Sequence, residues 1–279
     1  ATLSNSFTPA ALAGVETLTL VMNGASMNAT NVTGVTTLNI SSTTAGTAAV
    51  TNLTSTVTTV NQTSDLNVLN ISYASGSAGA LTLDYDSAAG SSAPINASTT
   101  IVNQAGALTI DGDTTVHHDL GSLTAASSTS LTVTSGAANL DIGNTAVGSA
   151  TSVVVTDSGA GNVTVGTLAA AKATSISVTQ TGTGTTNVGN ITAGAVLSSL
   201  VLTNSSTAAV TVGTITATTS LAVTSLDIDI NFTGVNASDN DIGNISVGTT
   251  GTITKLDYNA GTAGTQDNTV GTITAKDID

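Results

Sequence analysis

The heptapeptide DLGSLTA, at Asp119–Ala125, decides the fold, because close copies of it return along the rest of the chain. Each copy has glycine at its third position, and successive glycines are 22, 23, 23, 24, 30 and 28 residues apart. Self-similarity at such a period is typical of solenoids, in which each repeat packs only against its neighbours. The copies are DIGNTAV at Asp141–Val147, TVGTLAA at Thr164–Ala170, NVGNITA at Asn187–Ala193, TVGTITA at Thr211–Ala217, DIGNISV at Asp241–Val247 and TVGTITA at Thr269–Ala275.

A second apolar segment lies between successive glycine motifs. Its apolar residues largely alternate with Thr or Ser, which is the period of a half-buried strand. Each repeat therefore holds at least two short strands, joined by small-residue turns such as Thr181–Gly184. A repeat of this length predicts one coil of a right-handed parallel β-helix, with the recurring glycine at a bend or bulge. The second segments are Leu131–Val133, Val153–Val155, Ile176–Val178, Leu200–Leu202 and Leu221–Val223.

The first third of the chain repeats less regularly. Val15–Leu20 resembles Val35–Ile40, 20 residues later, and more loosely Val57–Val60. We therefore predict one all-β solenoid with coils of about 20 to 24 residues, in which residues 1–118 form less regular coils and residues 119–279 regular ones. The alternative is an array of small β-sandwiches, whose strands come about every 8–12 residues. The repeat is too short to give each unit a sandwich, so we prefer the solenoid.

The composition also favours a thin, elongated β protein. Charged residues make up 7% of the chain and aromatic residues 2%, whereas 40% are hydrophobic and the mean hydropathy is +0.33. Disordered chains combine low hydrophobicity with high charge, which is the opposite pattern. Abundant Thr and Val favour strands because they are β-branched. The core must then be built from Val, Ile, Leu and Ala, repeated many times.

The charge balance excludes several partners. The formal net charge is −14, and the basic residues are Lys172, Lys255 and Lys276. Nucleic-acid binding needs clusters of Lys and Arg, and attraction to anionic lipid needs them too. There is no cysteine and no apolar run long enough to span a membrane. The chain does not begin with Met, so we expect a segment of a longer secreted protein, with its export signal and anchor elsewhere.

Aspartates at positions i and i+2 are the candidate metal ligands. Such residues point to the same side of a strand, and Ca²⁺ takes six to eight oxygen ligands, mainly from carboxylates and carbonyls. Asp111-Gly112-Asp113 is the best candidate, because glycine lets the backbone turn and offer carbonyl groups, and Asp239-Asn240-Asp241 is the next. The alternative is that these carboxylates are solvated and keep the protein soluble. The candidate pairs are Asp84/Asp86, Asp111/Asp113, Asp227/Asp229, Asp239/Asp241 and Asp277/Asp279.

Catalysis is not expected. Nucleophilic catalysis needs a base beside Ser, Thr or Cys, but the histidines are two neighbours, His117 and His118, which face opposite ways on a strand. Paired carboxylates can hydrolyse glycosides. Trp and Arg are absent, however, and Tyr occurs three times, so platforms for a sugar substrate are scarce. We therefore predict a protein that is not an enzyme.

Two N-terminal segments carry a family resemblance. GVETLTL at Gly14–Leu20 and GVTTLNI at Gly34–Ile40 resemble segments that recur in bacterial surface-layer proteins and in related calcium-dependent proteins exported by type I secretion. The resemblance implies a β-solenoid that tiles a lattice, with calcium ordering the subunits. The calcium-binding nonapeptide GGxGxDxUx of that group does not occur in this sequence, so calcium would use other ligands.

Together these patterns predict a structural component of an extracellular surface layer or sheath. We expect the chain to assemble with copies of itself into a lattice or filament, with calcium as the cofactor and cell-surface polysaccharide as a further partner. The alternative is the passenger of an adhesin that binds a host, glycan or mineral surface as a monomer. Fold and composition fit both functions.

Overall fold

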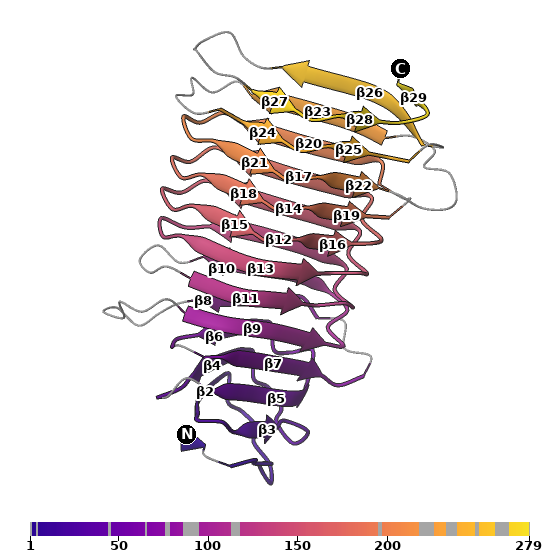
Figure 1. The fold of residues 1–279 in the computed structure, drawn as a ribbon. Helices are drawn as coiled ribbons and strands as arrows, with labels where there is room; N and C mark the ends of the chain where they lie inside the picture. The colour runs from indigo at the N-terminus through magenta and orange to yellow at the C-terminus, as the bar shows by residue number, and fades with distance from the viewer. Residues whose placement is uncertain are drawn as a thin grey trace.

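The protein is a right-handed β-solenoid of stacked parallel sheets (Figure 1), as the sequence predicts. The computed structural model describes residues 2–3, 5–43, 46–64, 66–75, 79–85, 95–112, 118–194, 197–217, 226–232, 239–248, 251–259 and 268–278. Those residues include strands and turns but no helix. Each pairing between strands is parallel, which excludes the array of antiparallel β-sandwiches.

The described strands form two sheets, which we call sheet 1 and sheet 2. Sheet 1 has 13 described strands, which are, in stacking order, β1 (Thr2–Leu3), β2 (Thr17–Met22), β4 (Thr37–Ser41), β6 (Thr59–Gln62), β8 (Leu81–Tyr85), β10 (Ala107–Gly112), β12 (Ser130–Ser135), β14 (Ser152–Asp157), β17 (Ser175–Gln180), β20 (Ser199–Asn204), β23 (Leu226–Phe232), β26 (Thr252–Asn259) and β29 (Asp277–Ile278). Sheet 2 has 16 described strands, which are β3 (Ser26–Asn28), β5 (Thr47–Leu53), β7 (Val68–Tyr73), β9 (Ile95–Val102), β11 (His118–Thr124), β13 (Leu140–Ala146), β15 (Val163–Val165), β16 (Leu168–Ala170), β18 (Thr186–Val188), β19 (Ile191–Ala193), β21 (Val210–Val212), β22 (Ile215–Ala217), β24 (Asp241–Ile242), β25 (Ile245–Ser246), β27 (Thr269–Val270) and β28 (Ile273–Thr274).

The strand register confirms the sequence alignment of the coils. Thr17 pairs with Thr37 and Thr37 with Thr59, which is the predicted N-terminal repeat. In the regular part, Val153 pairs with Leu131 below it and with Ile176 above it. The segment 221–223 lies outside the described residues, and so do residues 233–238 and 260–267, which fall within the two longest spacings between glycines. The strand that stacks on β20 is β23.

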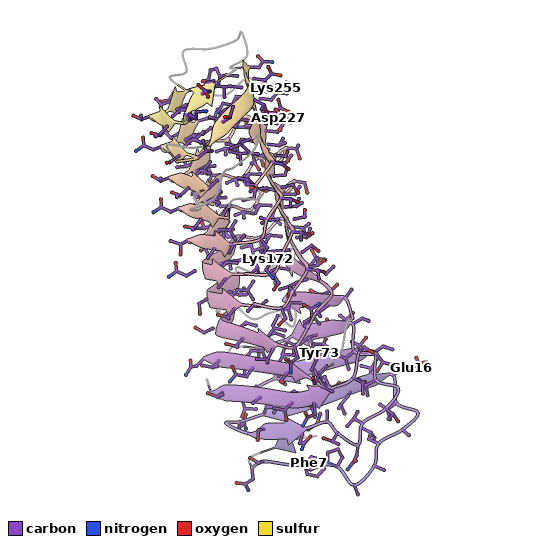
Figure 2. The ribbon with its side chains drawn as sticks, turned by 90° about the vertical axis from the view of Figure 1, so that its right-hand side faces the viewer. Phe7, Glu16, Tyr73, Lys172, Asp227 and Lys255 are labelled. Carbon is purple, nitrogen blue, oxygen red and sulfur yellow. The ribbon has the colours of Figure 1, made fainter. Side chains whose placement is uncertain are left out.

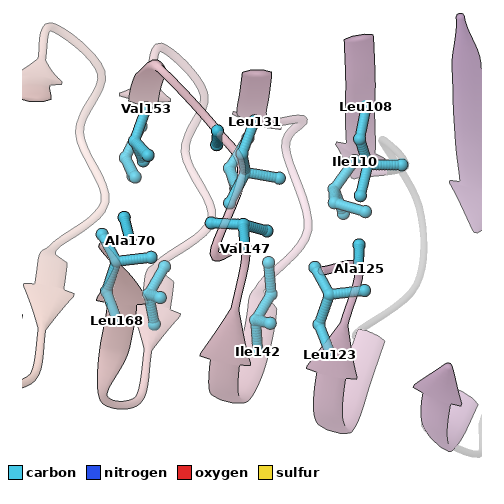
Figure 3. Close-up of a cluster of buried hydrophobic side chains, with 14 of the residues drawn as sticks. Leu108, Ile110, Leu123, Ala125, Leu131, Ile142, Val147, Val153, Leu168 and Ala170 are labelled. Atoms are coloured by element: carbon cyan, nitrogen blue, oxygen red, sulfur yellow. The ribbon is translucent and has the colours of Figure 1, made fainter. Parts of the chain in front are cut away.

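The core lies between the two sheets and is one cluster of buried side chains that runs from coil to coil. Figure 3 shows Leu108 and Ile110, from β10, pointing toward Leu123, from β11. These three side chains are fully buried. Most core residues are Leu, Ile, Val and Ala, as composition requires, and each coil gains burial only from its neighbours.

The repeated glycines form a column along sheet 2. From β15 onward each strand of that sheet is split in two, and the glycine occupies the break. A Cβ atom on Gly143 would lie 1.6 Å from the carbonyl oxygen of Gly121, and one on Gly189 would lie 2.8 Å from that of Gly166. From Gly166 onward the predicted bend is thus a break between two strands, and close approach of the coil below keeps a side chain out of the glycine column.

From Asn144 onward, Asn and Thr alternate in the position after the column glycine. Asn144 Oδ1 accepts hydrogen bonds from the backbone nitrogen of Thr167, at 3.2 Å, and from its hydroxyl, at 2.7 Å. Asn190 accepts from the Thr214 nitrogen in the same way, at 2.9 Å. The amide of one coil therefore holds a backbone N–H of the next coil, where the strand is interrupted.

A short row of polar side chains lies inside the solenoid, at the end of sheet 1. Ser135, Asp157, Gln180 and Asn204 are in register on successive strands, and all four are buried. Asn204 Nδ2 donates to the carbonyl oxygen of Ala208 at 2.7 Å, and Gln180 Nε2 donates to the carbonyl oxygens of Gly182 and Gly184. These side chains satisfy the backbone of the corner turns, which would otherwise be buried without partners.

Candidate functional site

The outer face of sheet 1 carries straight rows of short polar side chains, because outward residues of neighbouring coils are in register. Figure 2 shows side chains along the whole stack. Uncharged hydroxyl groups dominate these rows over many coils. A neighbouring molecule that contacts this face would therefore contact mainly hydroxyl groups. One row is Thr17, Thr37, Thr59, Thr82, Thr109 and Thr132, a second is Thr134, Thr156, Thr179 and Thr203, and a third is Ser130, Ser152, Ser175 and Ser199.

Two predicted metal ligands meet in one of these rows, across coils. Asp84 of β8 pairs directly with Asp111 of β10. Neighbouring strands are about 4.8 Å apart, so two carboxylates stand side by side. Asp111 is exposed, and its Oδ1 accepts a hydrogen bond from Thr134 Oγ1 at 2.9 Å. Their expected partners along each strand, Asp86 and Asp113, lie outside the described residues.

Asn61, which pairs with Asp84 from the preceding coil, adds an amide oxygen to the same row. Asn61 Nδ2 donates to Asn39 Oδ1 at 2.9 Å, and the neighbour of Asn61 on its other side is Asp84. Asn61 Oδ1 exposes less than 1 Å² and has no hydrogen-bond partner. A buried acceptor without a donor is unfavourable, and here it lies in the same row as two carboxylates.

A second acidic cluster, near the C-terminal end of the described stack, surrounds a lysine (Figure 2). Lys255 Nζ lies 2.7 Å from Asp257 Oδ2, 2.9 Å from Asp229 Oδ1 and 3.8 Å from Asp227 Oδ1. Hydrogen bonds to Asp257 and Asp229 raise the pKa of Lys255. The predicted pair Asp227/Asp229 thus faces one ammonium group from a single strand, β23.

The predicted pair Asp239/Asp241 lies at the start of β24, in sheet 2. Asp239 and Asp241 are both exposed, whereas Asn240 between them is buried. Asp241 Oδ1 accepts a hydrogen bond from Thr269 Oγ1 at 2.6 Å. The buried Asn240 accepts from Asn204 Nδ2 at 2.8 Å and so belongs to the interior polar row. Asp277 lies 3.4 Å from Lys276 at the end of the stack.

The interior polar row holds a carboxylate that solvent does not reach. Asp157 is 0% exposed and accepts hydrogen bonds from Ser135 Oγ at 2.6 Å and from Thr186 Oγ1 at 3.2 Å. Burial raises its pKa, and these hydrogen bonds act in the opposite direction. With its oxygens occupied by hydroxyl groups, Asp157 is a structural group.

Sequence reasoning missed the contacts between coils. Pairs at i and i+2 describe one strand, whereas Asp84 and Asp111 come together from strands one coil apart. The signal was present as the similar segments LTLD at Leu81–Asp84 and LTID at Leu108–Asp111. Lys255 was missed because its place depends on how β26 stacks on β23.

Two features of the described residues bear on the class of site. No three or more His, Cys, Asp and Glu side chains gather there closely enough to hold a metal ion between them. No helical span suited to crossing a membrane occurs in those residues either. The fold places the protein in the class of β-solenoids. Comparisons with protein-family models, with curated proteins and with solved structures found no match to this chain.

Proposed function

We propose that this chain is a structural component of an extracellular surface layer or sheath, in which copies of the solenoid assemble into a lattice or filament. The observation that carries the proposal is the repetition of the same short hydroxyl side chains, in register, along the outer face of sheet 1. Such a face offers a neighbouring copy the same contact at every coil. The role is mechanical and includes no catalytic step.

Calcium enters this proposal where carboxylates of neighbouring coils meet. Asp84 and Asp111 stand in one row, and Asn61 Oδ1 is a buried acceptor without a donor beside them. Ca²⁺ prefers such carboxylate and amide oxygens and needs six or more ligands. Three residues cannot fill that shell, so water or a second copy would supply the remaining oxygens. A calcium ion completed by a second copy would join two solenoids side by side.

The first experiment adds calcium and then excess chelator to the purified chain. Light scattering and electron microscopy follow particle size. We expect ordered sheets or filaments with calcium and their dissolution with chelator. A chain that stays monomeric at all calcium concentrations would contradict the calcium-ordered lattice.

A matched pair of variants locates the calcium. Asp111→Asn removes one carboxylate from the row, and Glu16→Gln removes one exposed charge elsewhere. We expect Asp111→Asn to raise the calcium concentration needed for assembly about tenfold, equivalent to about 1.4 kcal/mol, and Glu16→Gln to leave it unchanged. Equal effects would show that net charge, and not a site at Asp111, governs assembly.

The alternative function is that of an adhesin passenger, and one feature supports it. A hollow lined by Thr203, Asp229, Asn231 and Asp257 opens on the outer face of sheet 1, where the rows of hydroxyl groups end. A monomer that ignores calcium but binds a glycan would favour this function over the lattice.

A further inference from the structure

The middle of sheet 1 has an outer face without charge. β12, β14, β17 and β20 are successive strands of this sheet (Figure 1), and each turns its first, third and fifth residues outward. These residues are Ser at the first position, Thr, Val or Ser at the third, and Thr at the fifth, and all are half-buried. We call them the uncharged block. The block contrasts with a formal net charge of −14 for the whole chain.

Carboxylates border the uncharged block on both sides. On one side lies Asp111 of β10, and beyond it Asp84 of β8. On the other side lie Asp227 and Asp229 of β23. The centre of a protein interface is depleted in charged residues, whereas its rim is polar. This face has the same arrangement, with the uncharged block in the place of the centre.

The chemistry of the block matches a second copy of itself. A hydroxyl group both donates and accepts a hydrogen bond, so two hydroxyl faces can satisfy each other without any charged group. The methyl groups of Thr and Val add apolar area to the contact. A charged partner would find no opposite charge within the block, and a second copy needs none.

The positions of the carboxylates select one of two symmetric arrangements. If the two solenoid axes run antiparallel about a two-fold axis between β14 and β17, then β12 of one copy faces β20 of the other, and β10 faces β23. Each register row then faces the same row, so Asp111 faces Asn231 and Asp229 faces Thr109. If the axes run parallel, the central row faces itself strand by strand, and Asp229 meets its own counterpart. Like charges in contact repel, so the antiparallel arrangement is favoured.

The face is large enough for a stable dimer. The antiparallel arrangement overlaps eight described strands, from β8 to β26. With strands about 4.8 Å apart and about 17 Å long, each copy contributes roughly 650 Å². Specific interfaces bury about 1,200–2,000 Å² over both partners, and twice the area of this face falls in that range.

We propose that two copies dock through the uncharged block of sheet 1, with their solenoid axes antiparallel, and that this dimer forms without calcium. The inference rests on the proposed self-assembly and specifies its first contact. The dimer also places the Asn231 amide of one copy opposite Asp111 of the other, where a calcium ion would need further oxygen ligands. Calcium then acts on a dimer that already exists.

The test is sedimentation velocity on the full chain, over a range of concentrations, with chelator present throughout. We expect a monomer–dimer equilibrium with a Kd of about 10 μM or tighter. A chain that stays monomeric up to about 100 μM would overturn the inference. The calcium experiment is read separately. Dimers in chelator without calcium-dependent sheets support the dimer and contradict the lattice, whereas monomers in chelator that form sheets with calcium do the reverse.

Charge variants then test the face and the orientation. Ser130 of β12 and Ser199 of β20 are in one register row and face each other across the antiparallel dimer. Ser130→Asp and Ser199→Lys each bring an unpaired charge into the contact and should weaken dimerisation about tenfold or more. Ser122→Asp makes the same change at a half-buried serine of sheet 2 and should leave the Kd unchanged.

The double variant, with Ser130→Asp and Ser199→Lys in one chain, reports the orientation. The two positions lie three strands apart in their own chain, about 14 Å, which is too far for an ion pair. In the antiparallel dimer each new charge faces the opposite charge of the other copy, so dimerisation should recover. A thermal melt of each variant confirms that it is folded. Equal weakening by Ser122→Asp, or a folded double variant that stays as weak as the single variants, would overturn the proposal.

Discussion

A Cβ atom on Gly143 would lie 1.6 Å from the carbonyl oxygen of Gly121, well inside contact distance. The backbone conformation of Gly143 is not left-handed, since the described glycines with positive φ are Gly14, Gly24, Gly34 and Gly248. Space, and not φ, therefore requires glycine in the column along sheet 2. Because the restriction is steric, a Gly→Ala substitution, which adds one methyl group, tests it directly.

We expect Gly143→Ala to destabilise the fold by about 1–3 kcal/mol, the usual range for overpacking. Gly148→Ala is the matched control, because nothing lies within 4 Å of its added Cβ; it should change stability by less than about 0.5 kcal/mol. Denaturant unfolding measures both. Equal losses in the two variants would show that glycine flexibility, and not the close approach of coils, is what matters.

The buried Asp157 gives a pH dependence whose sign follows from its pKa. Burial raises that pKa above the ordinary 3.8, so the folded state holds the proton more tightly than the unfolded state does. Its contribution to stability is therefore present at low pH and is lost as pH rises through the folded pKa. Other carboxylates also titrate there, so a variant is needed to isolate this one.

The comparison is between wild type and Asp157→Asn, unfolded by denaturant at a series of pH values from about 3 to 7. We expect the stability of wild type, relative to the variant, to fall as pH rises over that range. Asn keeps the size of the side chain and stays neutral. A relative stability that is constant or rises with pH would contradict a raised pKa for Asp157.

At the scale of the strand pair, the side chain after the column glycine acts as a bridge between coils. Asn144 Oδ1 accepts a hydrogen bond from the backbone nitrogen of Thr167, which lies in the gap between β15 and β16. The next coil has Thr at the equivalent position and the one after has Asn again. An Asn in every second coil therefore links each interrupted strand to one neighbouring coil.

Asn144→Ala should cost about 0.5–1.5 kcal/mol, the net worth of a hydrogen bond. Asn144→Asp keeps an acceptor at the same distance and should restore most of that stability. Both are measured by denaturant unfolding at neutral pH. A similar loss in both variants would indicate that the Asn amide acts through its Nδ2 group or through packing.

At the scale of the molecule, each described coil is held by the coils above and below it, and the first and last described coils each pair with one described coil. Side chains of β29 are exposed, whereas those of β12, β14, β17 and β20 alternate between half-buried and buried. Hydrogen exchange should therefore be slowest for amides in 130–204 and fastest in β1, β27 and β29. Mass spectrometry of exchanged fragments measures this gradient. Uniform exchange along the stack would mean that the molecule opens in a single step.

Much of this architecture could be predicted from the sequence, because period-2 alternation and the glycine repeat are both local signals. Thr17 and Thr37 align in the sequence and pair in the structure. The groups that matter for binding are set by stacking. Asp84 meets Asp111 from 27 residues away, and Lys255 meets Asp229 only because a register shift precedes Asp227 in the β23–β26 pair. Because coil lengths vary, a fixed sequence period does not predict which residues of neighbouring coils pair.

The register between coils also bears on how such a protein changes in length. Val153 stacks on Leu131 and Ile176 on Val153, so a stretch of 22 or 23 residues can be duplicated or deleted without disturbing either face. Each event would move the two ends apart or together by about 4.8 Å, the spacing of strands. Tandem duplication in the coding sequence would therefore act as a ruler, setting the reach of the molecule in fixed steps while its surface chemistry stays the same.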